Sequence, residues 1–240
     1  MKTVLYKENT RGHANHGWLE TKHTFSFARY FNPNRMSFGL LRVVNDDKIA
    51  GGEGFGTHPH DNMEIVTIPL SGALAHKDSM GHEQVINPGE VQVMSAGTGI
   101  THSEYNAKFD QATELFQIWV FPRTQGLKPR YDQKEFDFDK IKNDLTLIVS
   151  PDGAEESLWV NQDVWFSLGN FDKNEEKTYQ VKKQENGVFA MVVEGEFEIA
   201  GTKLSRRDAI GVYQTNSFDI KALSDNARIL LIDVPMDSED

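Results

Sequence analysis

Two short stretches of the chain carry imidazole and carboxylate side chains at spacings suited to metal binding. His58 and His60 are separated by one proline, and His102 stands two residues before Glu104. Residues i and i+2 of a β-strand point to the same face, so each pair can project into one interior if both segments are strands. Three imidazoles and a carboxylate suit iron, nickel, copper, manganese or zinc, and the lack of thiolates disfavours a closed structural zinc site. Four such ligands leave two positions of a six-coordinate metal open, as a reactive metal requires.

Other polar residues near these pairs have competing interpretations. A lone His-x-His on a strand is more often a surface or packing pair, and it is the second pair that favours metal binding. Glu64 follows His58 by six residues, so strict alternation would place it on the same face. It is then either a further ligand or a partner that orients a histidine. We expect His76 and His82, which flank the turn 78–81, to be solvated.

The elements that position these pairs are predicted to be β-strands. Short runs rich in β-branched and aromatic residues are separated by Gly, Pro, Asn and Ser, and no long stretch with a helical period competes with them. The runs span residues 63–70, 90–94, 115–121, 145–149, 164–168, 188–193 and 229–234. Many short strands at close spacing predict an all-β sandwich or barrel.

A weak internal repeat suggests two copies of one architecture. Residues 70–74 align with 193–197, each a strand, a glycine turn and a returning strand, and residues 87–94 align with 205–213. The polar segment 130–140 is the best candidate for the connection. We therefore predict an N-terminal domain over residues 1–135 that holds the metal site and a C-terminal domain over residues 136–240.

Composition excludes several classes of protein. The chain has 240 residues, no cysteine, and 25 basic against 36 acidic side chains, a net charge of −11. Nucleic-acid and anionic-membrane surfaces need clustered Lys and Arg, so neither partner is expected. Without cysteine there is no disulfide framework, zinc finger or thiol nucleophile. The start lacks an apolar signal region and no run reaches 18 apolar residues, which predicts a cytoplasmic protein.

Two further segments near the site have plain explanations. The favoured interpretation of five N-terminal aromatic residues is that they cover the barrel, although some could line a pocket mouth and stack on an aromatic substrate; these are Trp18, Phe25, Phe27, Tyr30 and Phe31. The glycine-rich run 51–56 is a weak dinucleotide-loop signal, because no helical pattern follows it.

The spacing of these residues resembles the cupin motifs. The first motif matches Gly52-x5-His58-x-His60-x3-Glu64-x7-Gly72, and the second matches Gly89-x5-Ser95-Ala96-Gly97-x4-His102, with serine where cupins often carry proline. The chain resembles the pirin family within the cupins, in particular its bacterial quercetin 2,3-dioxygenase members. The matching segments are 11–18, 23–27, 55–60 and 94–104. The first half matches densely, and the second half matches by pattern.

This resemblance implies a bicupin fold of two stacked β-sandwich barrels with a metal in the N-terminal barrel only. It implies one divalent transition metal held by His58, His60, His102 and Glu104, with Fe(II) preferred and copper, nickel, manganese, cobalt or zinc as alternatives. The repeat alignment agrees on the second barrel. The counterparts of the ligands fall near Val181, Lys183, Ile220 and Ala222, which form no plausible metal site.

The resemblance further implies a dioxygenase that cleaves a flavonol such as quercetin with dioxygen and releases carbon monoxide. The acidic enol hydroxyl of a flavonol lies beside a carbonyl and can bind a Lewis-acidic metal. Glu104 would take the hydroxyl proton as the general base. The alternative is a pirin-like regulatory or redox-sensing protein that acts through a protein partner. A third hypothesis is turnover of another small molecule.

Overall fold

The structure, a computed structural model, describes residues 1–138, 140 and 142–236. It consists of strands with two short 3-10 turns, at Glu8–Thr10 and Ala154–Glu156. The N-terminal half contains β2 (Gly12–Asn15), β3 (Leu19–His23), β4 (Leu41–Ile49), β5 (Gly54–His60), β6 (Glu64–Ser71), β7 (Leu74–Asp78), β8 (Glu83–Ile86), β9 (Glu90–Ser95), β10 (Ile100–Asn106), β11 (Thr113–Val120) and β12 (Arg130–Glu135). The all-β prediction is confirmed.

The remaining strands build a second, similar unit. They are β1 (Lys2–Tyr6), β13 (Asp144–Ser150), β14 (Leu158–Trp159), β15 (Trp165–Phe171), β16 (Glu176–Gln180), β17 (Asn186–Glu194), β18 (Glu196–Ile199), β19 (Thr202–Ser205), β20 (Ala209–Tyr213), β21 (Ser217–Ala222) and β22 (Ala227–Pro235). Each unit is a sandwich of a seven-stranded and a four-stranded sheet rather than a closed barrel.

The strand orders of the two sandwiches correspond position by position. The N-terminal sheets run β12-β9-β6-β11-β4-β3-β2 and β5-β10-β7-β8, and the C-terminal sheets run β1-β20-β17-β22-β15-β13-β14 and β16-β21-β18-β19. The repeat seen in the sequence is therefore a repeat of sheet topology. It assigns β16 to the place of β5, β21 to that of β10, and β18 to that of β7.

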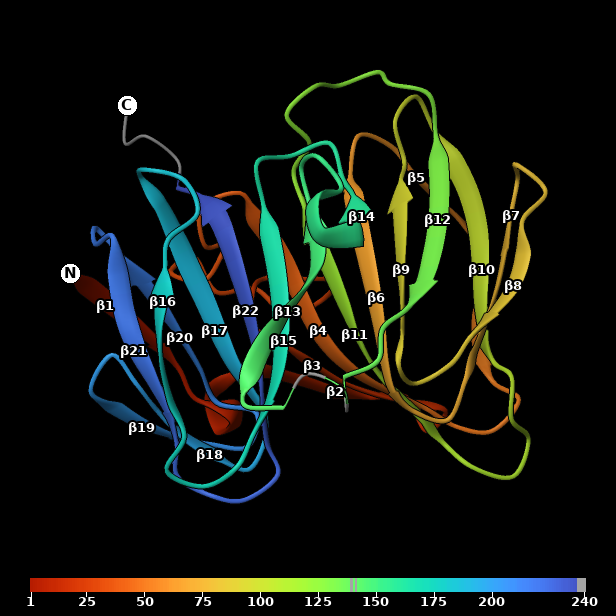
Figure 1. Ribbon diagram of the computed structural model, residues 1–240. Helices are drawn as coiled ribbons and strands as arrows, with labels where there is room; N and C mark the ends of the chain where they lie inside the picture. Colours follow the sequence, from red (N-terminus) through yellow and green to blue (C-terminus); the bar gives the residue numbers. More distant parts are fainter. Residues whose placement is uncertain (139, 141, 237–240) are drawn as a thin grey trace.

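The first strand of the chain belongs to the second sandwich. β1 pairs antiparallel with β20, in the position that β12 takes beside β9 in the first sandwich. The start of the chain therefore completes a sheet of the C-terminal half. In Figure 1, β1 lies beside the C-terminal strands. The division of the chain at residues 135 and 136 stays a prediction.

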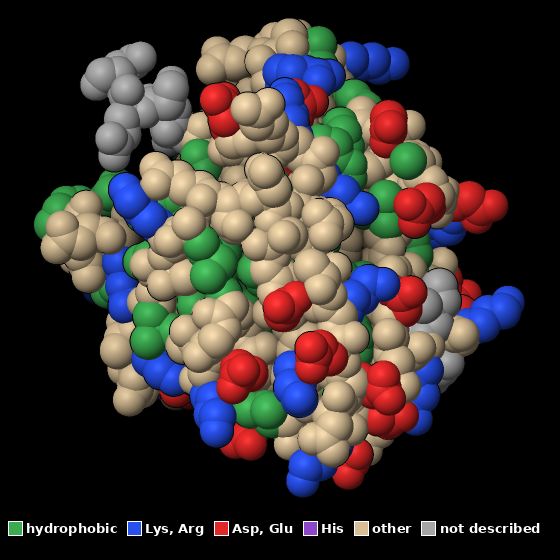
Figure 2. Space-filling view, turned by 60° about the vertical axis from the view of Figure 1, so that its left-hand side comes forward, with side chains coloured by type: hydrophobic (Ala, Val, Ile, Leu, Met, Phe, Trp, Pro, Cys, Tyr) green, Lys and Arg blue, Asp and Glu red, His purple; other side chains and the backbone are tan. Residues whose placement is uncertain are grey.

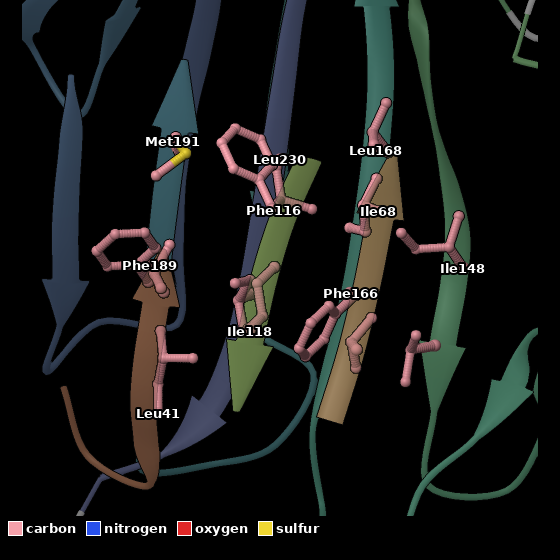
Figure 3. Close-up of a cluster of buried hydrophobic side chains, with 14 of the residues drawn as sticks. Leu41, Ile68, Phe116, Ile118, Ile148, Phe166, Leu168, Phe189, Met191 and Leu230 are labelled. Carbon is pink, nitrogen blue, oxygen red and sulfur yellow. The ribbon is translucent and has the colours of Figure 1, made fainter. Parts of the chain in front are cut away.

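The two seven-stranded sheets pack against each other, which makes four layers in all (Figure 1). Their facing sides hold the largest apolar cluster of the protein, drawn in Figure 3, with Phe116 and Ile118 from β11 opposite Phe166 and Leu230 from β15 and β22. Both sheets are thus covered on two faces, and their strands read as near-continuous apolar runs. Asn45, Asp47 and Gln117 interrupt these runs at positions that face the inside of the N-terminal sandwich.

The face of the molecule shown in Figure 2 carries both signs of charge. On the face turned forward in Figure 2, Lys and Arg side chains alternate with Asp and Glu rather than gathering in one basic patch. Within residues 1–138, 140 and 142–236, no helix is long and apolar enough to cross a membrane. The predicted absence of nucleic-acid and membrane partners stays a prediction.

The packing between the sheets predicts a large effect of Phe189. This side chain is fully buried and its ring lies 5.5 Å from that of Tyr6, 6.0 Å from Phe25 and 6.3 Å from Phe38, measured between centroids. Phe189→Ala should lower the free energy of unfolding by about 3–5 kcal/mol in urea denaturation. Val85 is half-exposed, so Val85→Ala serves as the control. An equal loss of unfolding free energy in both variants would contradict the assignment of this cluster as the main core.

Candidate metal centre

Strands β5 and β10 bring three histidines together inside the N-terminal sandwich. His58 and His60 come from β5 and His102 from β10, and one ligand atom of each lies within 4.8 Å of the others. The antiparallel register places His102 opposite His58. Past this pair the register shifts, so that Glu104 lies opposite Phe55. A bulge of this kind re-aims side chains and is common beside functional sites.

The rings are held so that ligand nitrogens face the interior. The Nδ1 atom of His58 lies 2.8 Å from the carbonyl oxygen of Gly56. A carbonyl can only accept, so Nδ1 carries the proton and Nε2 keeps its lone pair. His60 packs edge-on against Trp119, with ring centroids 4.9 Å apart. Two of the three histidines are thus oriented by contacts outside the cluster.

His102 provides the clearest sign that a metal fits here. Its Nε2 atom is buried and has no hydrogen-bond partner among the described residues. Burial and the neighbouring imidazoles of His58, His60 and His76 lower the pKa of His102 to about 2. Burial and His58 lower the pKa of His60 to about 4. Neutral imidazoles with free lone pairs are what a divalent transition metal binds.

Glu104 is the fourth predicted ligand and is 3% exposed. It lies outside the three-histidine group and forms a second group of potential ligands with His102 and His76. Its Oε1 atom accepts a hydrogen bond of 2.7 Å from the Gln117 amide. Burial, with a smaller contribution from Asp47, raises the pKa of Glu104 to about 7. His102 is therefore the residue that joins the three-histidine group to Glu104.

The site opens into a cavity of about 420 Å³, within the range of small-molecule pockets. Aromatic side chains form much of its wall, together with polar side chains from both sheets. The lining includes Trp18, Phe27, Phe55, Trp119, Asn45, Asp47, Gln117, the three histidines and Glu104. Such a cavity suits a flat aromatic ligand with one polar edge.

Comparison with known proteins assigns the family. The family model described as Pirin matches residues 5–120, and the one described as Quercetinase C-terminal cupin domain matches residues 147–234. The chain belongs to the pirin family. The prediction made from the cupin motifs is confirmed, and both halves of the chain are covered.

Individual pirins resemble the whole chain. A protein of Escherichia coli strain K12 named quercetin 2,3-dioxygenase is 46% identical over 231 residues, which cover 96% of this chain and 98% of that protein. A pirin-like protein of Caulobacter vibrioides is 39% identical, with 92% and 95% covered. The crystal structure of bacterial pirin YhhW of Escherichia coli in complex with nickel(II) matches with a TM-score of 0.93 and 44% identity, and covers 98% of this chain and all of that one.

This pirin fold provides a candidate metal centre in one sandwich only. Within residues 1–138, 140 and 142–236, groups of three or more potential ligands are confined to the N-terminal half. In the other half the pairing of β21 with β16 and β18 puts Tyr179, Val181, Phe218 and Ile220 at the places of His58, His60, His102 and Glu104. The predicted counterparts were two residues off along each strand, and the residues now found at these places offer neither an imidazole nor a carboxylate.

Glu64 is neither a ligand nor a partner of one. It is buried, but its Oε2 atom accepts a 2.7 Å hydrogen bond from Ser95, and the backbone of Asn161 in the other half also donates to it. It shares a face with Val66, which belongs to the cluster between the large sheets. The alternation argument was wrong because β5 and β6 belong to opposite sheets, so the period does not run through the turn between them.

The expectation that His76 is solvated was wrong. Its side chain is fully buried rather than solvated, and Nδ1 lies 3.4 Å from Nδ1 of His102. His82 is 38% exposed at the side chain. The turn 78–81 is at the surface as expected, but β7 alternates and directs His76 inward.

The N-terminal aromatic residues divide between the two roles considered. Trp18 and Phe27 line the cavity, whereas Phe25 packs in the core against Tyr6. Tyr30 stacks on His23, and Phe31 is 72% exposed. The covering role therefore holds for only part of the set.

Sequence reasoning missed a buried carboxyl group in the cavity. Asp47 is 4% exposed, and burial raises its pKa to about 7 against the opposing effect of a hydrogen bond with Thr21. Asn45 precedes it by two residues on the same face of β4. The signal was present, because Asn45 and Asp47 interrupt an apolar strand at inward-facing positions.

The raised pKa of Asp47 predicts a pH-dependent stability. Its value of about 7 in the folded chain exceeds the ordinary 3.8, so the folded state holds the proton longer and stability falls as the pH rises from about 4 to 7. Asp47→Asn removes this fall. In the metal-free protein the variant should gain stability over the wild type between pH 4 and 8, by at most about 1.4 kcal/mol per pH unit. Parallel denaturation curves at every pH would contradict the shift.

Proposed function

We propose that this pirin is a metal-dependent dioxygenase that opens the central ring of a flavonol such as quercetin and releases carbon monoxide. The observation that supports this most directly is the aromatic-walled cavity that His58, His60, His102 and Glu104 also line. The names of relatives agree with it. Location in the cytoplasm stays a prediction.

The histidines and Glu104 would hold one divalent transition metal, with Fe(II) as our first choice and nickel supported by the complex of a homologue. When bound, the metal supplies Lewis acidity toward an enol oxygen beside a carbonyl. The neutral state of the imidazoles leaves the ion with most of its charge. This keeps an anionic oxygen of the substrate strongly attracted to the site.

Glu104 is the group proposed to receive the proton of the flavonol hydroxyl. The Gln117 amide holds Oε1, which leaves Oε2 to accept that proton. Burial raises the pKa of Glu104 to about 7 in the metal-free protein. A bound divalent cation would lower the pKa from this value, so the side chain would be an ionised carboxylate, the form that accepts a proton.

The rest of the cavity orients the substrate and excludes water. Trp18 and Phe55 pack edge-on at 5.2 Å between centroids, as do Phe27 and Trp119 at 5.3 Å. These two pairs present aromatic surface to a planar ligand. Dioxygen would then add across the central ring of the flavonol. One carbon of that ring, together with the oxygen atom bound to it, would leave as carbon monoxide.

Carbon monoxide release tests the proposal. Protein loaded separately with iron, copper, nickel and manganese is given quercetin under oxygen, and His58→Ala is the control for metal binding. We expect metal-dependent carbon monoxide that is lost in the control. Stoichiometric metal without carbon monoxide from any loading would reject the flavonol reaction and direct attention to a regulatory role through a protein partner.

Glu104→Gln separates the base from the ligand. The amide keeps an oxygen donor and the size of the side chain but cannot accept the hydroxyl proton at neutral pH. The variant should retain much of its metal, measured by elemental analysis, while kcat for quercetin falls about a hundredfold or more. Unchanged turnover at full metal content would remove Glu104 from the proton transfer.

A further inference from the structure

Behind His102, on the side away from the cavity, a row of hydrogen bonds leads from Asp78 through His76 to the His102 ring. We propose that Asp78, acting through His76, fixes the proton of His102 on Nδ1 and thereby keeps Nε2 free to bind metal. Asp78 and His76 are thus positioning residues for the metal. The proposal rests on the metal centre proposed above but not on the flavonol reaction.

Asp78 begins the row as a fixed acceptor. Its Oδ1 atom accepts the backbone N–H groups of Met80 at 2.9 Å and His82 at 3.1 Å. Its Oδ2 atom lies 2.9 Å from Nδ1 of His82 and 3.2 Å from Nε2 of His76. Burial acts to raise the pKa of Asp78, but these hydrogen bonds outweigh it and hold the pKa below its ordinary value. An ionised carboxylate can only accept.

The hydrogen bond to Asp78 determines which nitrogen of His76 carries the proton. Since Asp78 cannot donate, Nε2 of His76 must carry the proton of that hydrogen bond. The side chain of His76 is fully buried, and in a neutral imidazole only one nitrogen carries a hydrogen. Its Nδ1 atom is therefore an acceptor, and it faces Nδ1 of His102 at 3.4 Å.

His102 completes the row. Of two facing nitrogens one must donate, and the Nδ1 atom of His76 is already an acceptor. The proton of His102 therefore lies on Nδ1, and Nε2 carries the lone pair. This is the buried atom without a partner among the described residues, and it is the one a metal would occupy.

The strand register and a tyrosine hold the row in place. Antiparallel pairing of β7 with β10 sets Asp78 opposite His102 and His76 opposite Glu104. Tyr131 of β12 stacks on His82 with centroids 4.8 Å apart and covers His76 at the same distance. The ring planes of His76 and His82 are therefore fixed by packing as well as by hydrogen bonds.

The second sandwich shows that the fold does not need this row. Counting from the matching turns at Gly72 and Gly195, the place of His76 is taken by Ile199, and the place of His102 by Phe218. Both replacements are buried apolar residues. The polar row occurs only in the sandwich that carries the candidate metal site, which favours a role toward the metal over a role in packing.

Asp78→Asn should reverse the direction of the hydrogen bonds from residue 78 through His76 to His102 while leaving the side chains in place. The Met80 and His82 N–H groups retain an oxygen at the Oδ1 position, so the new NH2 group takes the Oδ2 position and donates to Nε2 of His76. His76 then carries its proton on Nδ1, His102 must accept there, and Nε2 of His102 becomes protonated. The ligand lone pair is lost although every side chain stays in place.

The test has two readouts, neither of which is enzymatic activity. Imidazole 15N NMR of the metal-free protein should show His102 protonated on Nδ1 in the wild type and on Nε2 in Asp78→Asn. Competition with a chelator for Zn(II) should show an affinity loss of about 10–100-fold in that variant. His82→Ala is the matched control, because it removes another contact of Asp78 but keeps the carboxylate, and it should retain both the tautomer and the affinity.

Wild-type His102 protonated on Nε2 would overturn the proposal without any variant. An Asp78→Asn protein with unchanged tautomer and unchanged Zn(II) affinity would also overturn it, as would an equal loss in His82→Ala. If the wild type binds Zn(II) and follows this scheme but releases no carbon monoxide from quercetin, only the proposed reaction fails.

Discussion

Burial of imidazole and carboxyl groups inside the N-terminal sandwich, among them His76, His102, Asp47 and Glu104, constrains how the rest of the chain packs. The groups around His102 and Glu104 have no cation among the described residues to balance them, and their pKa values move toward the neutral forms. Removing polar groups from water costs free energy unless they find partners. The N-terminal sandwich thus gives up stability at the place where its interior would otherwise be filled with hydrocarbon.

The second sandwich and the layer between the halves offset that cost. The inside of the C-terminal sandwich is filled by buried apolar side chains, including Phe171, Phe197 and Ile220. The contact between the two large sheets adds a cluster that draws on strands from both halves. Strand β1 ties the chain start to the C-terminal sheet, so the site-bearing half is held from both ends. A copy of the same architecture filled with apolar side chains in this sense supports the sandwich that holds the candidate metal centre.

The sequence predicted the parts of this arrangement that depend on local spacing. The His-x-His and His-x-Glu pairs lie on strands and converge because period-two alternation is a local property. Glu64 and His76 were misassigned because their surroundings depend on which sheet each strand joins. Asp47 interrupts an apolar strand and so left a local signal, but its place beside Thr21 and Glu104 depends on the pairing of other strands. The pairing of β1 with β20 spans about the whole chain and left no local signal in its five residues.

The register also explains how an inward-facing polar band can cross an apolar sheet. His23 lies opposite Asn45, Asn45 opposite Gln117, and Gln117 opposite Thr67. Asn45 and Gln117 of this band line the same cavity as the candidate metal centre. The side-chain amide of Gln117 donates a hydrogen bond to Oε1 of Glu104. Asp78 and His76 act on His102 from the other sheet. Both sheets of the sandwich therefore hold the site: the large sheet contacts Glu104 through Gln117 and His60 through Trp119, and the small sheet contacts His102 through His76. Relative movement of the sheets would alter both together, which gives a physical reason for building the site between two rigid layers rather than on a loop.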